Sequence, residues 1–215
     1  MTDPARPETR SARKRRAIME AATTLFLRNG YQGTSMDEIA ALAAVSKQTV
    51  YKHFADKERL FTDIILSVTE RVGELLSAEI TALADTGDLE RDLNELARRH
   101  VSSVVQPHVV RLRRLVIGEA DRFPALGRTF WERGPERVIN ELADSFRRLD
   151  ERGLLRTGDP HLAASHYAYL VLSAPLDRAM FCGDEEVAKL AAGDLHSPAD
   201  EGVRAFLTAY GARPA

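Results

Sequence analysis

Apolar residues recur at spacings of three and four along almost the whole chain, and the alternation typical of strands is missing. Such spacings place apolar side chains on one face of an α-helix. The stripe nearest the N-terminus stops before Gly30, a natural helix end. It contains the residues Ile18, Ala21, Ala22, Leu25 and Phe26. The pattern predicts an all-α fold.

Two short helices are predicted next, over residues 36–43 and 47–54. The first follows the sequence Ser-Met-Asp-Glu, in which Ser35 and Glu38 can cap each other's backbone amides. Ser46 is a second candidate for a helix N-cap. The turn between these helices is only three residues long, which holds them at a steep angle and predicts a helix-turn-helix.

Longer stripes fill the rest of the chain and bring the predicted number of helices to nine. Asp56 caps a long fourth helix, and residues 86–88 separate it from the fifth. Pro107 opens the sixth, Gly134–Pro135 predicts a kink in the seventh, and Pro198 opens the last. These helices are long enough to form a second domain behind the helix-turn-helix.

The outward face of the helix predicted at 47–54 carries hydrogen-bonding groups and no acid. Val50 and Phe54 are its inward positions. Lys47 can donate to guanine, Gln48 can read adenine, and the Thr49 methyl can contact thymine. The remaining outward residues, which suit phosphate oxygens, are Tyr51, Lys52 and His53. These residues favour DNA binding, but a helical hairpin with a merely polar face is an open alternative.

The small net charge of −2 conceals an uneven distribution. Residues 1–60 contain 11 Lys and Arg against 7 Asp and Glu, whereas the remainder contains 19 against 25. A basic segment on an acidic body indicates that the N-terminal part faces a polyanion. The arginines near the N-terminus either follow the minor groove of DNA or form a solvated tail.

Composition and single residues narrow the class of protein. No apolar run reaches the ~18–20 residues that span a bilayer, and the basic N-terminus lacks the apolar core of a secretory signal. Cys182 is the only cysteine, which excludes an intrachain disulfide and fits a reducing cytoplasm. The histidines are not grouped with carboxylates at ligand spacing. We therefore expect a cytoplasmic protein with neither metal nor cofactor.

Two segments carry a family resemblance. Residues 30–40 read GYQGTSMDEIA, and residues 45–61 read VSKQTVYKHFADKERLF. Together they resemble the DNA-binding signature of the TetR family of regulators, nearly continuously over residues 16–61. The chain departs from the family at Ala44 and Gln48, where glycine is common. A longer side chain at Gln48 favours a base contact, so we interpret it as a specificity residue.

A weaker resemblance covers the C-terminal body. Residues 114–124 read RLVIGEADRFP and residues 130–135 read FWERGP, which is similar to the AefR-like subgroup with its C-terminal sensor domain. The resemblance implies a flexible basic arm at 1–12, a three-helix DNA-binding domain at 13–57, and a helical ligand-sensing and dimerisation domain at 58–215.

The resemblance also implies three sets of site residues. The DNA-binding set is Thr34, Ser35, Ser46, Lys47, Gln48, Thr49, Tyr51, Lys52, His53 and Lys57. The effector-pocket set is Val105, Leu112, Leu115, Val116, Glu119, Phe123, Phe130, Trp131, Leu142, Phe146, Tyr167 and Leu170. The dimer set is Tyr167, Val171, Ala174, Met180, Phe181, Phe206, Leu207 and Tyr210. For each apolar member of the pocket set, packing in the ordinary core is the more common explanation.

We expect a homodimer that binds a pseudo-palindromic operator as a repressor and leaves it when a small apolar or amphipathic effector binds. An activator of the same fold and an architectural DNA-binding protein are alternatives. A helical enzyme is unsupported, because the chain lacks a Gly-rich phosphate loop, a G-x-S-x-G elbow and an H-E-x-x-H motif.

Overall fold

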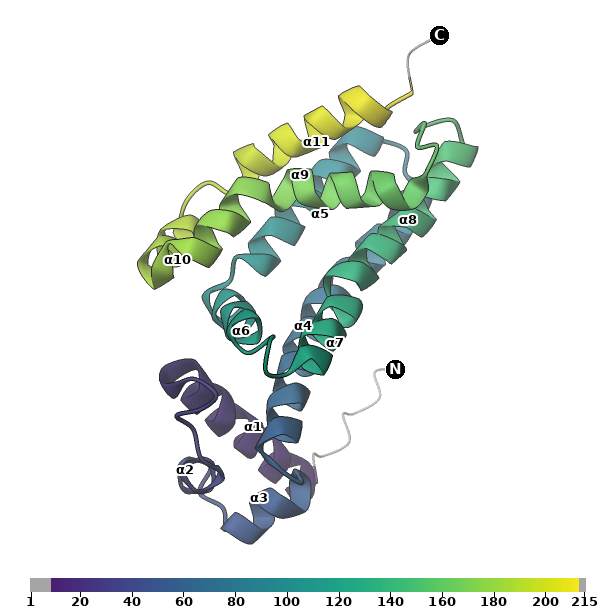
Figure 1. Ribbon diagram of the computed structural model, residues 1–215. Coiled ribbons are helices and arrows are strands. Elements are labelled where there is room, and N and C mark those ends of the chain that lie inside the picture. Colours follow the sequence, from purple (N-terminus) through teal and green to yellow (C-terminus); the bar gives the residue numbers. More distant parts are fainter. Residues whose placement is uncertain (1–8, 213–215) are drawn as a thin grey trace, which may run out of the picture. The chain divides into compact units, whose positions relative to one another are not determined.

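The structure, a computed structural model, describes residues 9–212 and divides into two compact units at Ser67 (Figure 1). Within that range every regular element is a helix, and the lone β-bridge joins Leu155 to Gly211. The predicted all-α fold is confirmed. None of the helices in residues 9–212 combines the length and the apolar content needed to cross a membrane.

The first unit contains three helices and the beginning of a fourth. These helices are α1 (Arg10–Asn29), α2 (Met36–Leu42), α3 (Lys47–His53) and α4 (Lys57–Ala82). Aromatic rings form the centre of its core. Phe26 lies 5.7 Å from Tyr31 and 5.0 Å from Phe61, measured between ring centroids. This cluster joins α1, the loop after it and α4, and so fixes the frame that holds the two short helices.

Helix α1 begins earlier than the sequence pattern indicates. The Thr9 hydroxyl caps it by accepting a hydrogen bond from the Ala12 amide at 3.1 Å. Residues 10–12, which we expected in a flexible arm, therefore form the first helical turn. The rest of the expected arm, residues 1–8, lies outside the described residues.

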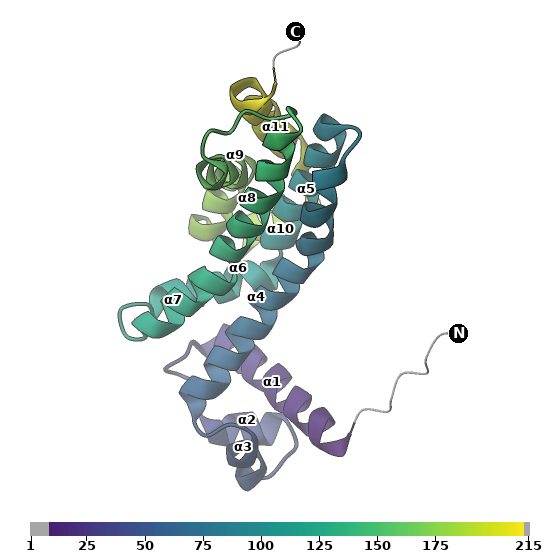
Figure 2. The same cartoon turned by 90° about the vertical axis from the view of Figure 1, so that its right-hand side faces the viewer.

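The second unit contains the remainder of α4 and the elements that follow it. They are η1 (Leu83–Asp85), α5 (Leu89–Val104), α6 (Pro107–Gly118), α7 (Pro124–Arg133), α8 (Pro135–Glu151), α9 (Pro160–Phe181), α10 (Gly183–Ala192) and α11 (His196–Tyr210). Figures 1 and 2 show α9 packed against α8 and α11. The fully buried rings of Phe146, Tyr167 and Phe206 meet there, with centroids 5.2–5.7 Å apart.

Parts of the second unit also differ from the prediction, and α11 begins at His196, two residues before the predicted Pro198. The kinked helix expected around Gly134–Pro135 is two helices, α7 and α8. A Cβ added at Gly134 would lie 2.6 Å from the Thr69 side chain, so the chain passes α4 too closely for a larger residue. Helix α10 was not predicted, because Val187 is its one buried residue. A single apolar position shows no spacing of three or four residues that would indicate a helix.

Candidate nucleic-acid interface

Helix α2 begins with the reciprocal cap that the sequence predicts. The Glu38 amide donates to the Ser35 hydroxyl oxygen at 3.2 Å, and the Glu38 carboxylate accepts from the Ser35 amide at 2.8 Å. The Ser35 hydroxyl also donates to this carboxylate, and these hydrogen bonds hold the pKa of Glu38 below its ordinary value. Both partners are exposed, and the carboxylates of Asp37 and Glu38 lie at the helix start, where they stabilise the positive end of the helix dipole.

The turn between α2 and α3 depends on one left-handed residue. Ala44 has a φ of 52°, a region in which glycine is favoured over residues that carry a Cβ. The next amide, Val45, donates back to the Ala40 carbonyl at 3.1 Å. Ser46 then caps α3 by accepting from the Thr49 amide at 3.2 Å. The turn keeps the helix-turn-helix geometry although alanine replaces the common glycine.

We expect Ala44→Gly to stabilise the first unit by about 0.5–1 kcal/mol. Relief of the left-handed strain exceeds the extra chain entropy that glycine brings to the unfolded state. Chemical denaturation of the full chain measures the change. Ala43→Gly is the matched control, because Ala43 has an ordinary φ of −75°, and it should destabilise the unit by a similar amount. Changes of equal sign in both variants would contradict the assignment of strain to Ala44.

Helix α3 presents the face that the sequence predicts. Val50 and Phe54 are buried and hold the helix against the core of the first unit. Gln48, Tyr51 and Lys52 are exposed, and in residues 9–212 their side chains form no intramolecular hydrogen bond. The donors and acceptors of this face are therefore available to an external partner.

Lys47 has a partner that sequence reasoning missed. Its ammonium lies 2.8 Å from the Asp37 carboxylate at the start of α2, and this hydrogen bond raises the pKa of Lys47. Both side chains are about 60% exposed, at 60% and 63%, so the pair contributes little stability. A DNA phosphate or a guanine edge can replace Asp37. Lys47 and Asp37 are ten residues apart and lie on different helices, so the spacing of residues within one helix could not predict their contact.

Two residues of the predicted DNA-binding set support the loop between α1 and α2 instead of facing outward. Thr34 is buried, and its hydroxyl donates to the Gly30 carbonyl at 2.9 Å. The Lys57 ammonium donates to the Tyr31 and Thr34 carbonyls, each at 2.9 Å, and lies 4.4 Å from the centre of the Tyr31 ring. Both carbonyls lie outside any helix, and the Tyr31 carbonyl also accepts from the Thr34 amide at 3.4 Å, so the lysine side chain adds a donor to each.

The described surface of α3 is thus a polar, acid-free helix face on a capped two-helix frame. Comparison with known proteins points the same way. Residues 18–64 match the profile of the bacterial regulatory proteins of the tetR family, and residues 91–212 match that of the AefR-like transcriptional repressor C-terminal domain.

The chain belongs to the TetR family.

Solved structures agree over nearly the whole chain. A regulator assigned to the TetR family from Mesorhizobium loti is 46% identical, with a TM-score of 0.85 over 95% of this chain and 100% of that one. A flavonoid-responsive regulator is 30% identical, with a TM-score of 0.73 over 94% of this chain and 99% of that one. The predicted family and its two-part architecture are confirmed.

Curated relatives match over shorter lengths. A transcriptional repressor of Streptomyces coelicolor is 34% identical over 106 residues, which are 49% of this chain and 48% of the repressor. An uncharacterized regulator of Bacillus subtilis is 41% identical over 59 residues, or 27% of this chain and 31% of that protein. The chain thus spans a third to a half of the curated relatives that it matches first.

The effector-pocket residues expected for a TetR-family regulator are spread over three environments. Most of the buried ones belong to the central core, where the Tyr167 hydroxyl donates to the Leu93 carbonyl at 2.7 Å. Glu119 and Phe130 are partly buried, and Trp131 and Leu170 are exposed. A cleft of about 310 Å³ lies elsewhere, between α4, α5 and α6, and its lining includes none of the twelve predicted residues. Apolar spacing does not distinguish the wall of a pocket from the core.

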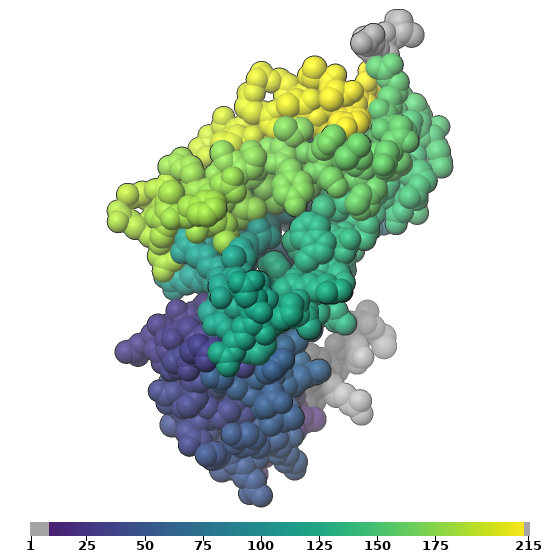
Figure 3. Space-filling view, in the orientation of Figure 1, coloured from purple at the N-terminus to yellow at the C-terminus, as the bar shows by residue number. Residues whose placement is uncertain are grey.

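The expected dimer set is also divided. Tyr167, Val171 and Phe206 are at most 1% exposed, so their side chains are covered by the chain itself and leave no surface for a partner. Phe181 is 85% exposed, and Ala174, seven residues earlier on the same helix, is also exposed. The other three residues of the set, which are partly buried, are Met180, Leu207 and Tyr210. In Figure 3 the light-green α9 crosses the viewed face and no other helix covers it.

Proposed function

We propose that this TetR-family chain is a cytoplasmic, non-enzymatic repressor that binds a pseudo-palindromic operator as a homodimer and leaves it when a small molecule binds the second unit. The exposed face of α3 carries this proposal. Its side chains can hydrogen-bond to base edges and phosphates, and it holds no acid that would repel DNA. The match of residues 91–212 to an AefR-like repressor domain supports repression over activation.

We assign the reading of bases to the N-terminal part of α3, which enters the major groove in helix-turn-helix proteins. Lys47, Gln48 and Thr49 occupy that part. The phosphate set is Ser35, Ser46, Tyr51, Lys52 and His53. Thr34 and Lys57 support the loop and act on DNA only through it. Residues 13–57 are the proposed DNA-binding domain, and the remaining residues from 58 sense the effector and dimerise.

The outer face of α9 is the proposed dimer surface. It exposes apolar side chains on one side of the helix, among them Leu170 at 39% and Phe181 at 85%, which are eleven residues or about three turns apart. Exposed apolar groups that gather on one face mark an interaction site. Two copies related by a two-fold axis would place their α3 helices one helical turn of DNA apart, about 34–36 Å, or a multiple of this.

The effector is proposed to be a small apolar or amphipathic molecule. A flavonoid-responsive regulator has the same fold at 30% identity, which supports a response to such compounds. Helix α4 is one continuous helix that begins at Lys57 beside the helix-turn-helix and carries four residues of the cleft. We propose that the effector favours a position of α4 that does not fit the operator. By thermodynamic linkage, the effector then lowers the affinity for DNA by the same factor by which DNA lowers the affinity for the effector.

A gel shift with the promoter region of the chain's own gene tests the proposal. We expect a shift at nanomolar concentration with a full palindrome, since specific complexes have a Kd of about 10⁻⁸–10⁻¹¹ M. A single half-site should bind at least about 100-fold more weakly, because it engages one reading helix instead of two. Equal binding to the palindrome, the half-site and unrelated DNA would contradict the proposed function.

A further inference from the structure

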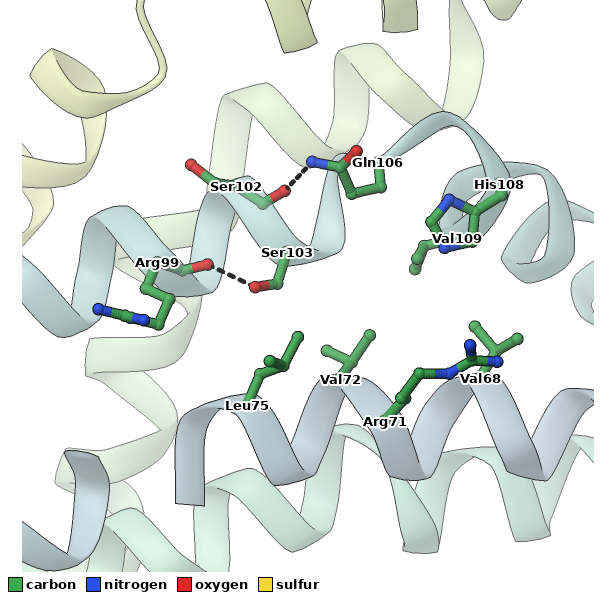
Figure 4. A pocket seen from close by; sticks show the side chains of 10 residues that line it. All are labelled: Val68, Arg71, Val72, Leu75, Arg99, Ser102, Ser103, Gln106, His108 and Val109. Carbon is green, nitrogen blue, oxygen red and sulfur yellow. Dashed lines mark hydrogen bonds between the residues drawn. The ribbon is translucent and has the colours of Figure 1, made fainter. Parts of the chain in front are cut away.

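The cleft between α4, α5 and α6 has a mainly apolar wall on α4, which also carries Arg71, and a mainly polar wall opposite, which also carries Val109 (Figure 4). Val68, Val72 and Leu75 of α4 form the apolar side, and Leu75 is 58% exposed there. The polar side, from α5 and the start of α6, comprises Arg99, Ser102, Ser103, Gln106 and His108. A volume of about 310 Å³ suits a compact molecule of one or two rings.

The charged residues that line the cleft are all basic, within the lining that the structure describes. Arg99 is neutralised by Glu79, whose carboxylate lies 2.6 Å from the guanidinium. Arg71 differs, because its side chain forms no hydrogen bond or ion pair within residues 9–212. Of the acids nearest to it on α4, Glu70 pairs with Arg133 of α7 at 3.1 Å, and Glu74 forms no ion pair with Arg71 in the part of the chain that the structure describes. The hydrogen-bond donors of the Arg71 guanidinium are therefore available to a ligand in the cleft.

His108 supplies a second polar group beside this charge. Figure 4 places the Arg71 guanidinium and the His108 ring at the same end of the cleft, away from Leu75 and Arg99. Burial, and then the charge of Arg71, lower the pKa of His108, and its imidazole carries an N–H donor whether or not it is protonated. One end of the cleft is thus cationic and rich in donors, and the rest of its floor is apolar.

We propose that this cleft binds an amphipathic aromatic carboxylate, with the carboxylate on Arg71 and the ring system on Val68, Val72 and Leu75. The inference deepens the proposed function, on which it rests, by naming the chemical class of the effector. A guanidinium presents paired N–H donors that match the two oxygens of a carboxylate. An amine of the same shape would be repelled by the same charge.

Isothermal titration of the full-length protein with 2-naphthoate and its neutral isostere 2-naphthamide tests the inference. We expect naphthoate to bind about five- to tenfold more tightly, as one partly exposed ion pair contributes about 1 kcal/mol. Arg71→Gln should abolish this preference, whereas Arg71→Lys should retain part of it because the charge remains. Arg128→Gln, at an exposed arginine of α7 outside the cleft, is the matched control and should leave the preference unchanged.

Equal affinity for the two probes, a preference for the amide, or no binding of naphthoate at about 1 mM would overturn the inference. A preference that survives Arg71→Gln would overturn it too, since the carboxylate would then lie elsewhere. The gel shift without naphthoate reports separately on the proposed function. If the protein shifts the operator but fails the titration, the proposed function stands and the ligand class is wrong. If it binds naphthoate through Arg71 but does not shift the operator, the ligand class stands and the proposed function is wrong.

Discussion

Gln48→Ala should weaken operator binding by about 30-fold or more while leaving binding to unrelated DNA nearly unchanged. A bidentate contact between an amide side chain and a base contributes about 1–3 kcal/mol of discrimination, and a dimer makes the contact twice. Gln48 is exposed, and no side-chain hydrogen bond within residues 9–212 ties it to the protein. Its removal therefore costs base recognition without disturbing the fold. Fluorescence anisotropy with operator and scrambled duplexes measures both affinities.

Lys52→Gln is the matched comparison on the same helix. Lys52 is equally exposed but suits phosphate, so its loss should weaken operator and scrambled DNA by the same factor. The slope of log affinity against log salt should fall by about one for each phosphate contact that is lost. If Gln48→Ala also weakened both duplexes equally, Gln48 would contact phosphate, and the reading of bases would have to be assigned to Lys47 or Thr49.

Local chemistry explains why the sequence predicted the caps and the buried positions of α2 and α3 well. The cap between Ser35 and Glu38 spans three residues, and the Ser46 cap also acts within one turn. Apolar positions such as Val50 then decide which face of α3 is buried. Each of these signals is short in range and is therefore visible in the sequence. The set of exposed side chains on α3 follows from these signals.

Contacts between distant residues could not be predicted in this way. The pairing of Lys47 with Asp37 depends on the angle across the turn. The cleft depends on how far α4 lies from α5, and the same Val72 would be core if these helices packed more closely. Similarly, Leu142 shows helical spacing whether it lines a cavity or packs in the interior. Distances between helices, and not residue types, decide these cases.

Lys57 either supports the loop before α2 or contacts DNA directly, and these two roles predict opposite effects on stability. In the structure its ammonium joins the start of α4 to the Tyr31 and Thr34 carbonyls. Lys57→Met keeps the length of the side chain but removes both charge-assisted hydrogen bonds and the contact with the Tyr31 ring. We expect a loss of about 2–4 kcal/mol. A unit of roughly 60 residues has about 3–9 kcal/mol in total, so much of its stability would be lost.

Thermal unfolding followed by circular dichroism, and hydrogen exchange of the α2 and α3 amides, measure this loss. The second unit should keep its protection, because Lys57 hydrogen-bonds to carbonyls of the first unit. Lys52→Met is the control, since the Lys52 side chain has no hydrogen-bond partner in residues 9–212 and its replacement should leave the melting curve unchanged. If Lys57→Met melted like the wild type yet lost operator binding, Lys57 would contact DNA directly. A lower melting temperature, with operator affinity recovered on cooling, would identify Lys57 as a support for the loop that positions α2.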